Sequence, residues 1–141
     1  IGYSVNGYYH LQIGRALCYK ALGQKEKAIQ IMETQLAVDG FEQGLFDYLH
    51  LGVLYLELED YQNAILYFQK QSAFNELAEN QFYSGLTYKA LGQISKYNNA
   101  IKQAKELYLK DVKMFDPYVE QIDKIYLAEI EQELKALKEI E

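Results

Sequence analysis

The sequence predicts an all-α fold in which pairs of helices repeat along the chain. One hexapeptide, Tyr-Lys-Ala-Leu-Gly-Gln, occurs at residues 19–24 and again, unchanged, at residues 88–93. Apolar residues recur at steps of three and four, the spacing that places side chains on one face of a helix. The 141 residues include one proline, so few positions interrupt a helix. A recurring unit of this length indicates one supersecondary element used several times.

Three copies of the unit can be aligned. A tyrosine stands at the same place in each copy, at residues 19, 55 and 88, with spacings of 36 and 33 residues. An Ala-Ile pair follows in every copy, beginning at residues 28, 64 and 100. Both halves of the unit therefore repeat, and each half is predicted to be a helix. The expected helices lie near residues 7–22, 25–38, 44–58, 61–72, 76–91 and 96–113.

Glycine and alanine mark the junctions within each unit. Gly23 and Gly92, in the two hexapeptides, are interpreted as turns between helices, because glycine is favoured just after a helix ends. Ala16, Gly52 and Gly85 each precede the aligned tyrosine by three positions. We expect the two helices of a hairpin to approach closely at these small residues, since a missing or short side chain lets backbones meet.

A final helix is expected over residues 117–139. Asp116 is suited to the N-cap and Pro117 to the first helical position. The early apolar side chains should cover the open flank of the third repeat, as a terminal repeat requires: Tyr118, Ile122, Ile125 and Tyr126. Further on comes a coiled-coil seam, through which a homodimer at residues 127–137 is the alternative to a cap: Leu127, Ile130, Leu134 and Leu137.

This arrangement resembles the tetratricopeptide repeat (TPR), a helix–turn–helix unit of about 34 residues. The resemblance covers residues 9 to about 110 and is most complete in the second copy, which has Tyr48, Leu51, Gly52, Tyr55, Leu58, Tyr61, Ala64 and Phe68 in place. It implies one domain over residues 1–141, a right-handed superhelical stack with a long C-terminal capping helix. The repeats would lie at about 9–40, 45–77 and 78–113.

The resemblance also implies where a partner binds. The first helix of each pair lines the concave side of such a stack. The family's groove positions fall here on His10, Ile13, Leu17, Lys20, Phe46, Leu49, His50, Val53, Glu57, Glu79, Phe82, Tyr83, Leu86 and Lys89. Family members that clamp a C-terminal carboxylate use lysine, asparagine and arginine where this chain has Ile13, Leu17, His50, Glu79 and Tyr83.

An apolar groove of this kind suits an amphipathic helix or an extended apolar peptide. Phe46, Phe82 and Tyr83 would be its anchors, because buried aromatic side chains dominate binding energy. The alternative is a groove filled from within, by residues 1–9 or by repeats outside this sequence.

The charge of the chain argues against two classes of partner. The net charge is −6 and the isoelectric point is near 5.0. Binding to a phosphate backbone needs clustered basic residues, so no nucleic acid is expected. No segment approaches the ~20 consecutive apolar residues that span a bilayer, so direct membrane insertion is not expected. The expected partner is a protein or a peptide.

Few side chains are suited to catalysis or to metal binding. The two histidines, His10 and His50, lack cysteine or carboxylate neighbours at metal-site spacing, so no catalytic residue, metal or cofactor is predicted. Cys18 is the single cysteine, and its apolar neighbours predict a buried, small hydrophobic residue. A lone cysteine fits a reducing compartment such as the cytoplasm.

The function expected from these observations is a protein–protein interaction scaffold rather than an enzyme, binding a peptide or helix in the concave groove. Two alternatives stay open: a peptide-sensing regulatory domain of a larger protein, and a structural dimer through the C-terminal helix. The scaffold and the sensor would use the groove, whereas the dimer would use the last helix.

Overall fold

A computed structural model of the chain describes residues 5–115 and 122–140, with side chains from Leu11 onward. These ranges contain helices and no strand. The helices are α1 (Val5–Ala21), α2 (Lys25–Leu36), α3 (Asp47–Glu57), α4 (Tyr61–Phe74), α5 (Ala78–Ala90), α6 (Ile94–Leu109) and α7 (Leu127–Ile140). The predicted all-α class is confirmed, and each of the six repeat helices ends within a few residues of its expected position.

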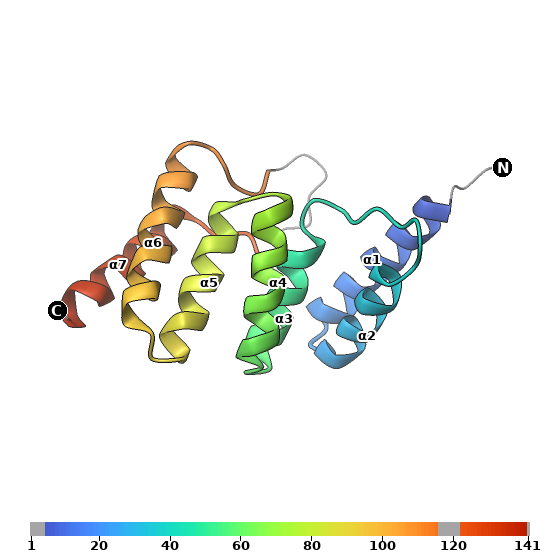
Figure 1. The fold of residues 1–141 in the computed structure, drawn as a ribbon, viewed down its shortest axis with the longest axis horizontal. Helices are drawn as coiled ribbons and strands as arrows, with labels where there is room; N and C mark the ends of the chain where they lie inside the picture. The colour runs from blue at the N-terminus through green and yellow to red at the C-terminus, as the bar shows by residue number, and fades with distance from the viewer. Residues whose placement is uncertain (1–4, 116–121, 141) are drawn as a thin grey trace.

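The first six helices form three antiparallel hairpins that stand side by side in a row (Figure 1). Each hairpin packs on the next, with α2 and α1 against the second pair and α4 against α5. α1 and α7 lie at opposite ends of the row, and α7 packs beside α6. Three clusters of buried apolar residues lie within and between the hairpins, as expected of units that cannot bury both faces alone.

The repeated hexapeptide is a helix-terminating motif. In the first copy, Gln24 donates its backbone N–H to the Tyr19 carbonyl and Gly23 donates to the Lys20 carbonyl, at 2.9 and 3.0 Å. This pair of hydrogen bonds defines a Schellman motif, and it places Gly23 in the left-handed region with φ of 82°. The motif recurs after α3 and α5, where Glu59 and Gly92 have φ of 62° and 75°. The glycine turns predicted at Gly23 and Gly92 are thereby confirmed.

The small residues sit where two helices meet. A Cβ added at Gly52 would lie 2.4 Å from the ring of Phe68, and one added at Gly85 would lie 2.8 Å from Cδ1 of Ile101. In both hairpins the first helix therefore touches the second through its backbone, which agrees with the expected close approach. Ala16 is fully buried at the same place in the first hairpin.

The predicted start of the last helix is wrong. Residues 122–126 are irregular and α7 begins at Leu127, while Asp116, Pro117 and Tyr118 lie outside the described residues. Asp123 has a positive φ of 67°, which ends any continuous helix at that point. The Glu129 side chain accepts the N–H of Tyr126 at 3.0 Å, as in a capping box, so the helix starts immediately afterwards.

The seam expected on this helix faces the third repeat. Ile130 and Leu137 are buried together with Tyr97 and Ile101 of α6, and Leu134 packs against the same cluster. Lys105 of α6 also pairs with Glu131 of α7 at 2.9 Å. In the single chain this face of α7 therefore covers the flank of the third repeat.

Cys18 is exposed, contrary to the expectation that it is buried. It follows Leu17 by one residue, which rotates it about 100° around a helix axis and away from the face that packs inward. Within the residues that the structure describes, no helix combines the length and the apolar character needed to cross a bilayer.

Candidate functional site

The predicted groove positions lie on the first helix of each hairpin, and we call this surface of α1, α3 and α5 the first-helix face. Most of these positions are buried: Ile13, Leu17, Lys20, Leu49, His50, Val53, Glu79 and Phe82. The half-buried ones are Phe46, Tyr83 and Leu86, and the exposed ones are Glu57 and Lys89, while the side chain of His10 lies outside the described residues. Most of the positions expected to line an open groove are therefore not accessible to solvent.

Described parts of the chain between α6 and α7 lie on this face. We call residues 112–115 and 122–126 the covering segment; in Figure 1 the part leading into α7 passes behind α5. Filling from within, by residues 1–9 or by further repeats, was the alternative to an open groove; among the described residues, a segment that follows the third repeat lies on this face. A first-helix face lined with apolar side chains is stabilised when any nearby segment removes it from water.

Residues 112–115 supply apolar contacts. Met114 is 3% exposed and packs in one cluster with Leu49 and Val53 of α3. The ring of Phe115 meets that of Phe46 edge to face, with centroids 5.7 Å apart. The carbonyl of Val112 accepts the N–H of Ala78, the first residue of α5, at 2.8 Å. This half of the covering segment is thus held at both α3 and α5.

Glu79 joins the two halves of the covering segment. Its fully buried carboxylate accepts the backbone N–H of Met114 at 2.9 Å and that of Ile125 at 3.4 Å. Glu79 lies in the first turn of α5, where the helix dipole favours a negative charge. Ile125 itself is 1% exposed and packs with Phe82 of the same helix.

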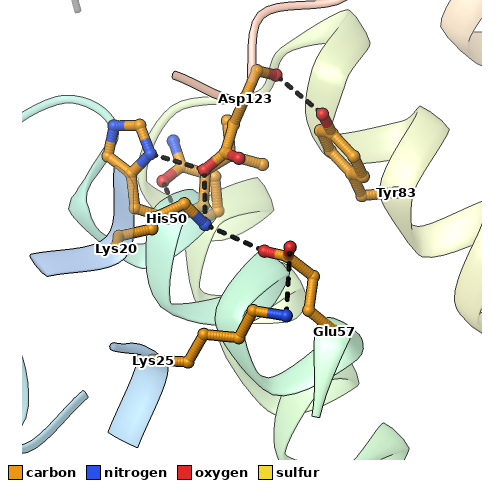
Figure 2. Close-up of polar contacts among 8 residues, drawn as sticks. Lys20, Lys25, His50, Glu57, Tyr83 and Asp123 are labelled. Carbon is orange, nitrogen blue, oxygen red and sulfur yellow. Dashed lines mark hydrogen bonds and ion pairs between the residues drawn. The ribbon is translucent and has the colours of Figure 1, made fainter. Parts of the chain in front are cut away.

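Asp123 places a carboxylate against two residues of the predicted groove. One of its oxygens, Oδ2, lies 3.0 Å from Nζ of Lys20 and 2.7 Å from Nδ1 of His50. Its backbone carbonyl accepts the phenol O–H of Tyr83 at 3.0 Å. Figure 2 shows Lys20, His50 and Tyr83, from three different helices, converging on this one residue.

The electrostatics of this cluster are those of a largely dry ion pair. The side chains of Lys20 and Asp123 are only 6% and 8% exposed, so removal of either partner would leave an uncompensated charge. Glu57 accepts a second contact from Lys20 at 3.5 Å and pairs with Lys25 at 3.6 Å. Burial, and then the carboxylate of Asp123, raises the pKa of Tyr83, which therefore stays protonated and able to donate.

One polar atom of the cluster has no hydrogen-bond partner among the residues that the structure describes. This atom is the buried Nε2 of His50, whose Nδ1 contacts Asp123. The arrangement is suited to holding a carboxylate between an ammonium group and an imidazole. Among the described residues, histidine, cysteine and carboxylate side chains nowhere gather in the groups of three that a metal ion would need.

Sequence reasoning located one side of this site and missed the other. Lys20, His50, Glu79 and Tyr83 were predicted to line one surface, and the structure brings them to one segment. Lys89 differs, because it pairs with Glu133 of α7 at 3.2 Å. Asp123 and Met114 were not foreseen as groove contacts, since no local pattern indicates which distant helices a connecting segment will cover.

Comparison with known proteins gives a family and a fold. Residues 9–40 and 48–75 match the family model of the tetratricopeptide repeat. No curated protein matches the chain. The third hairpin lies outside the two matched segments and is shown by the structure.

Solved structures share the fold over nearly the whole chain. PcrH from Pseudomonas aeruginosa is 17% identical, with a TM-score of 0.73, and the alignment covers 97% of this chain and 96% of PcrH. The Yersinia enterocolitica type III secretion translocator chaperone SycD is 15% identical, with a TM-score of 0.73 and coverage of 92% and 91%. A structure of PcrH with the chaperone binding region of PopD is 16% identical, with a TM-score of 0.74 and coverage of 97% and 95%.

Proposed function

Because this chain carries tetratricopeptide repeats stacked in series, we propose that it is a protein-binding scaffold whose first-helix face holds a segment of another polypeptide. One observation carries the proposal: the face already holds a segment of polypeptide. Glu79 accepts two backbone N–H groups of the covering segment, and Lys20 meets its carboxylate. Peptide-binding surfaces use the same two kinds of contact, main-chain hydrogen bonds for affinity and side-chain sites for specificity.

The comparisons support this proposal. PcrH has been solved with the chaperone binding regions of PopB and of PopD, so a protein of this fold holds parts of other proteins. The apolar side chains of the predicted groove are also in use here, because Leu49, Val53 and Phe82 contact the covering segment. We propose that a partner engages this same apolar surface.

Site-specific photocrosslinking tests the proposal without disturbing the core. Glu57 lies at the exposed rim of the first-helix face, and Gln30 is exposed on α2, a second helix. A benzophenone amino acid placed at Glu57 is expected to crosslink a partner in the native cell, whereas the same group at Gln30 should not. Equal crosslinking from both positions, or crosslinking from Gln30 alone, would contradict the proposed face.

The alternative of a homodimer through residues 127–137 has less support. Ile130 and Leu137 are already packed against α6, so a second copy could use them only if α7 left the third repeat. Sedimentation at increasing protein concentration is expected to show a monomer throughout. A dimer that is lost in an Ile130→Asp variant, with the helix content retained, would restore this alternative.

A further inference from the structure

We propose that the first-helix face binds an extended partner segment carrying an acidic residue between apolar residues, and that Ile122–Ile125 occupies its place in the free chain. The inference rests on the proposed protein-binding function and names the chemistry of the partner. The sequence of this part of the covering segment, Ile-Asp-Lys-Ile, is taken as the template. The following paragraphs derive each feature of the partner from the contacts of that template.

The acidic residue of the partner segment is inferred from the charged side chains at this site. Lys20 and Lys25 carry two positive charges at this site, and Glu57 and Asp123 carry two negative ones. If the covering segment leaves, Glu57 is the carboxylate among the described residues that still pairs with the two lysines, and the nearly buried Lys20 loses its closest partner. Since a buried charge requires compensation, an incoming segment is favoured when it brings a carboxylate to the same place.

The extended conformation of the partner segment is inferred from the hydrogen bonds that Glu79 accepts. A residue inside a helix has already paired its N–H with the carbonyl four residues earlier, so it has no free donor to offer. Glu79 takes N–H groups from Met114 and Ile125, both of which lie in irregular chain. A partner that replaces these bonds with its own main chain presents unpaired backbone donors, which excludes the interior of a helix at that point.

The apolar residues of the partner segment are inferred from the burial of Ile122 and Ile125. Ile125 is almost fully enclosed beside Phe82, and it comes two positions after the acid. Ile122 directly precedes the acid and is half-buried. An empty site would expose these apolar contacts to water, so a partner gains when it refills them.

The covering segment can be displaced because its own fit is incomplete. The buried Nε2 of His50 makes no hydrogen bond to the described part of the covering segment, which costs free energy that a partner with a suitably placed polar group would recover. Asp123 also adopts a left-handed φ of 67°, which aspartate tolerates better than most residues but less readily than glycine. In competition, a tethered segment acts like a ligand at about millimolar concentration, so it weakens a partner's apparent affinity without abolishing it.

The test uses full-length protein and a synthetic peptide. The probe is a fluorescent peptide with the sequence of residues 110–127, and its control carries Asp123→Lys. In the full chain, Asp123→Lys should release the covering segment from Lys20 and His50 while leaving the face intact. We expect this variant to bind the native peptide at least tenfold more tightly than the wild-type chain does, and to discriminate against the lysine peptide. Equal affinity for the two peptides would overturn the proposal.

A charge exchange supplies a second, independent readout. In a Lys20→Glu chain the preference is expected to reverse, so that the lysine peptide binds more tightly than the native one. A Lys105→Glu chain breaks a pair of similar length, 2.9 Å to Glu131 on α7, and should bind the native peptide as the wild type does. If Asp123→Lys lowers the helix content, Asp123→Asn keeps the size of the side chain and should tighten peptide binding in the same direction.

The outcomes separate this inference from the proposed function. A partner crosslinked at Glu57 through a segment without an acidic residue would overturn the inference and leave the scaffold function standing. Selective binding of the native peptide together with crosslinking only from Gln30 would reject the proposed function and uphold the acid-binding chemistry. A wild-type dimer that disappears in Asp123→Lys would overturn the proposal of a partner, because the occupant would be a second copy of the chain.

Discussion

Replacing Gly52 with alanine should destabilise the protein even though alanine is the better helix former. The new Cβ would lie 2.4 and 2.5 Å from two ring carbons of Phe68, a side chain that is 1% exposed. Carbon atoms do not approach so closely without displacement, and a ring enclosed on all sides has nowhere to move. The backbone of α3 and the ring of α4 must therefore separate.

The magnitude follows from two opposing effects. In a helix interior, alanine is favoured over glycine by about 1 kcal/mol. Overpacking a well-filled core costs about 1–3 kcal/mol, and this contact belongs at the upper end because the ring is enclosed. We therefore expect Gly52→Ala to lower the free energy of unfolding by about 2 kcal/mol.

Two other glycines provide matched controls. Gly14 lies in α1 with nothing within 4 Å of an added Cβ, so Gly14→Ala should raise the free energy of unfolding by about 1 kcal/mol. At Gly85 the added Cβ would meet the flexible end of Ile101 at 2.8 Å, and the two effects should nearly cancel. Since helix propensity is common to all three variants, the difference between Gly52→Ala and Gly14→Ala measures packing alone.

Urea unfolding followed by circular dichroism at 222 nm measures these differences, provided that the slope with denaturant is unchanged. The expected order of stability is Gly14→Ala, wild type with Gly85→Ala, and then Gly52→Ala. A Gly52→Ala variant as stable as Gly14→Ala would refute the reasoning, because the two hairpin helices could not then be in backbone contact at this residue.

Three further predictions concern the helix ends, the covering segment and alkaline pH. Glu59→Gly should raise the free energy of unfolding by about 0.5–1 kcal/mol in the same urea assay, because the left-handed φ of 62° is unfavourable for glutamate. The other two copies of the repeat have glycine at this position. An unchanged free energy of unfolding would contradict the assignment of a Schellman motif at the end of α3. Glu79→Gln should lower the free energy of unfolding by about 2 kcal/mol and accelerate amide hydrogen exchange in the covering segment, since a hydrogen bond to a charged group contributes about 1.5–3 kcal/mol. An unchanged exchange rate would mean that Glu79 does not hold this segment. Burial and nearby carboxylates raise the pKa of Tyr67, Tyr83 and Tyr97, so the folded state keeps protons that the unfolded chain releases above pH ~10. Stability should therefore fall as pH rises from about 9 to 11, measured by urea midpoints, and a midpoint that rises instead would reverse the assigned sign.

Local sequence was sufficient to predict the repeats because their signals act over one or two turns. The hexapeptide matches a Schellman motif, whose two hydrogen bonds join residues only a few positions apart. Gly52 and Gly85 indicated the close approach within each hairpin for a similar reason, since hairpin partners are near in sequence. The helices, the turns and the family resemblance could all be predicted in this way.

The state of the predicted groove could not be predicted from those signals. Asp123 meets Lys20 of the first repeat and His50 of the second, across most of the length of the chain. The irregular segment that makes these contacts continues to Tyr126, and α7 begins at Leu127, where the sequence alone favoured an earlier helix. Cys18 likewise owes its exposure to its position on the outer side of the first helix.

The amino-acid sequence by itself determined the helical period, the chain reversals and the small residues at which paired helices touch, since each depends on neighbours along the chain. The tertiary structure alone decided that the covering segment lies on the first-helix face and that a carboxylate fills the space between Lys20 and His50. The physical reason is that burial of an apolar surface and compensation of a buried charge reward whichever segment reaches them, irrespective of its distance in sequence.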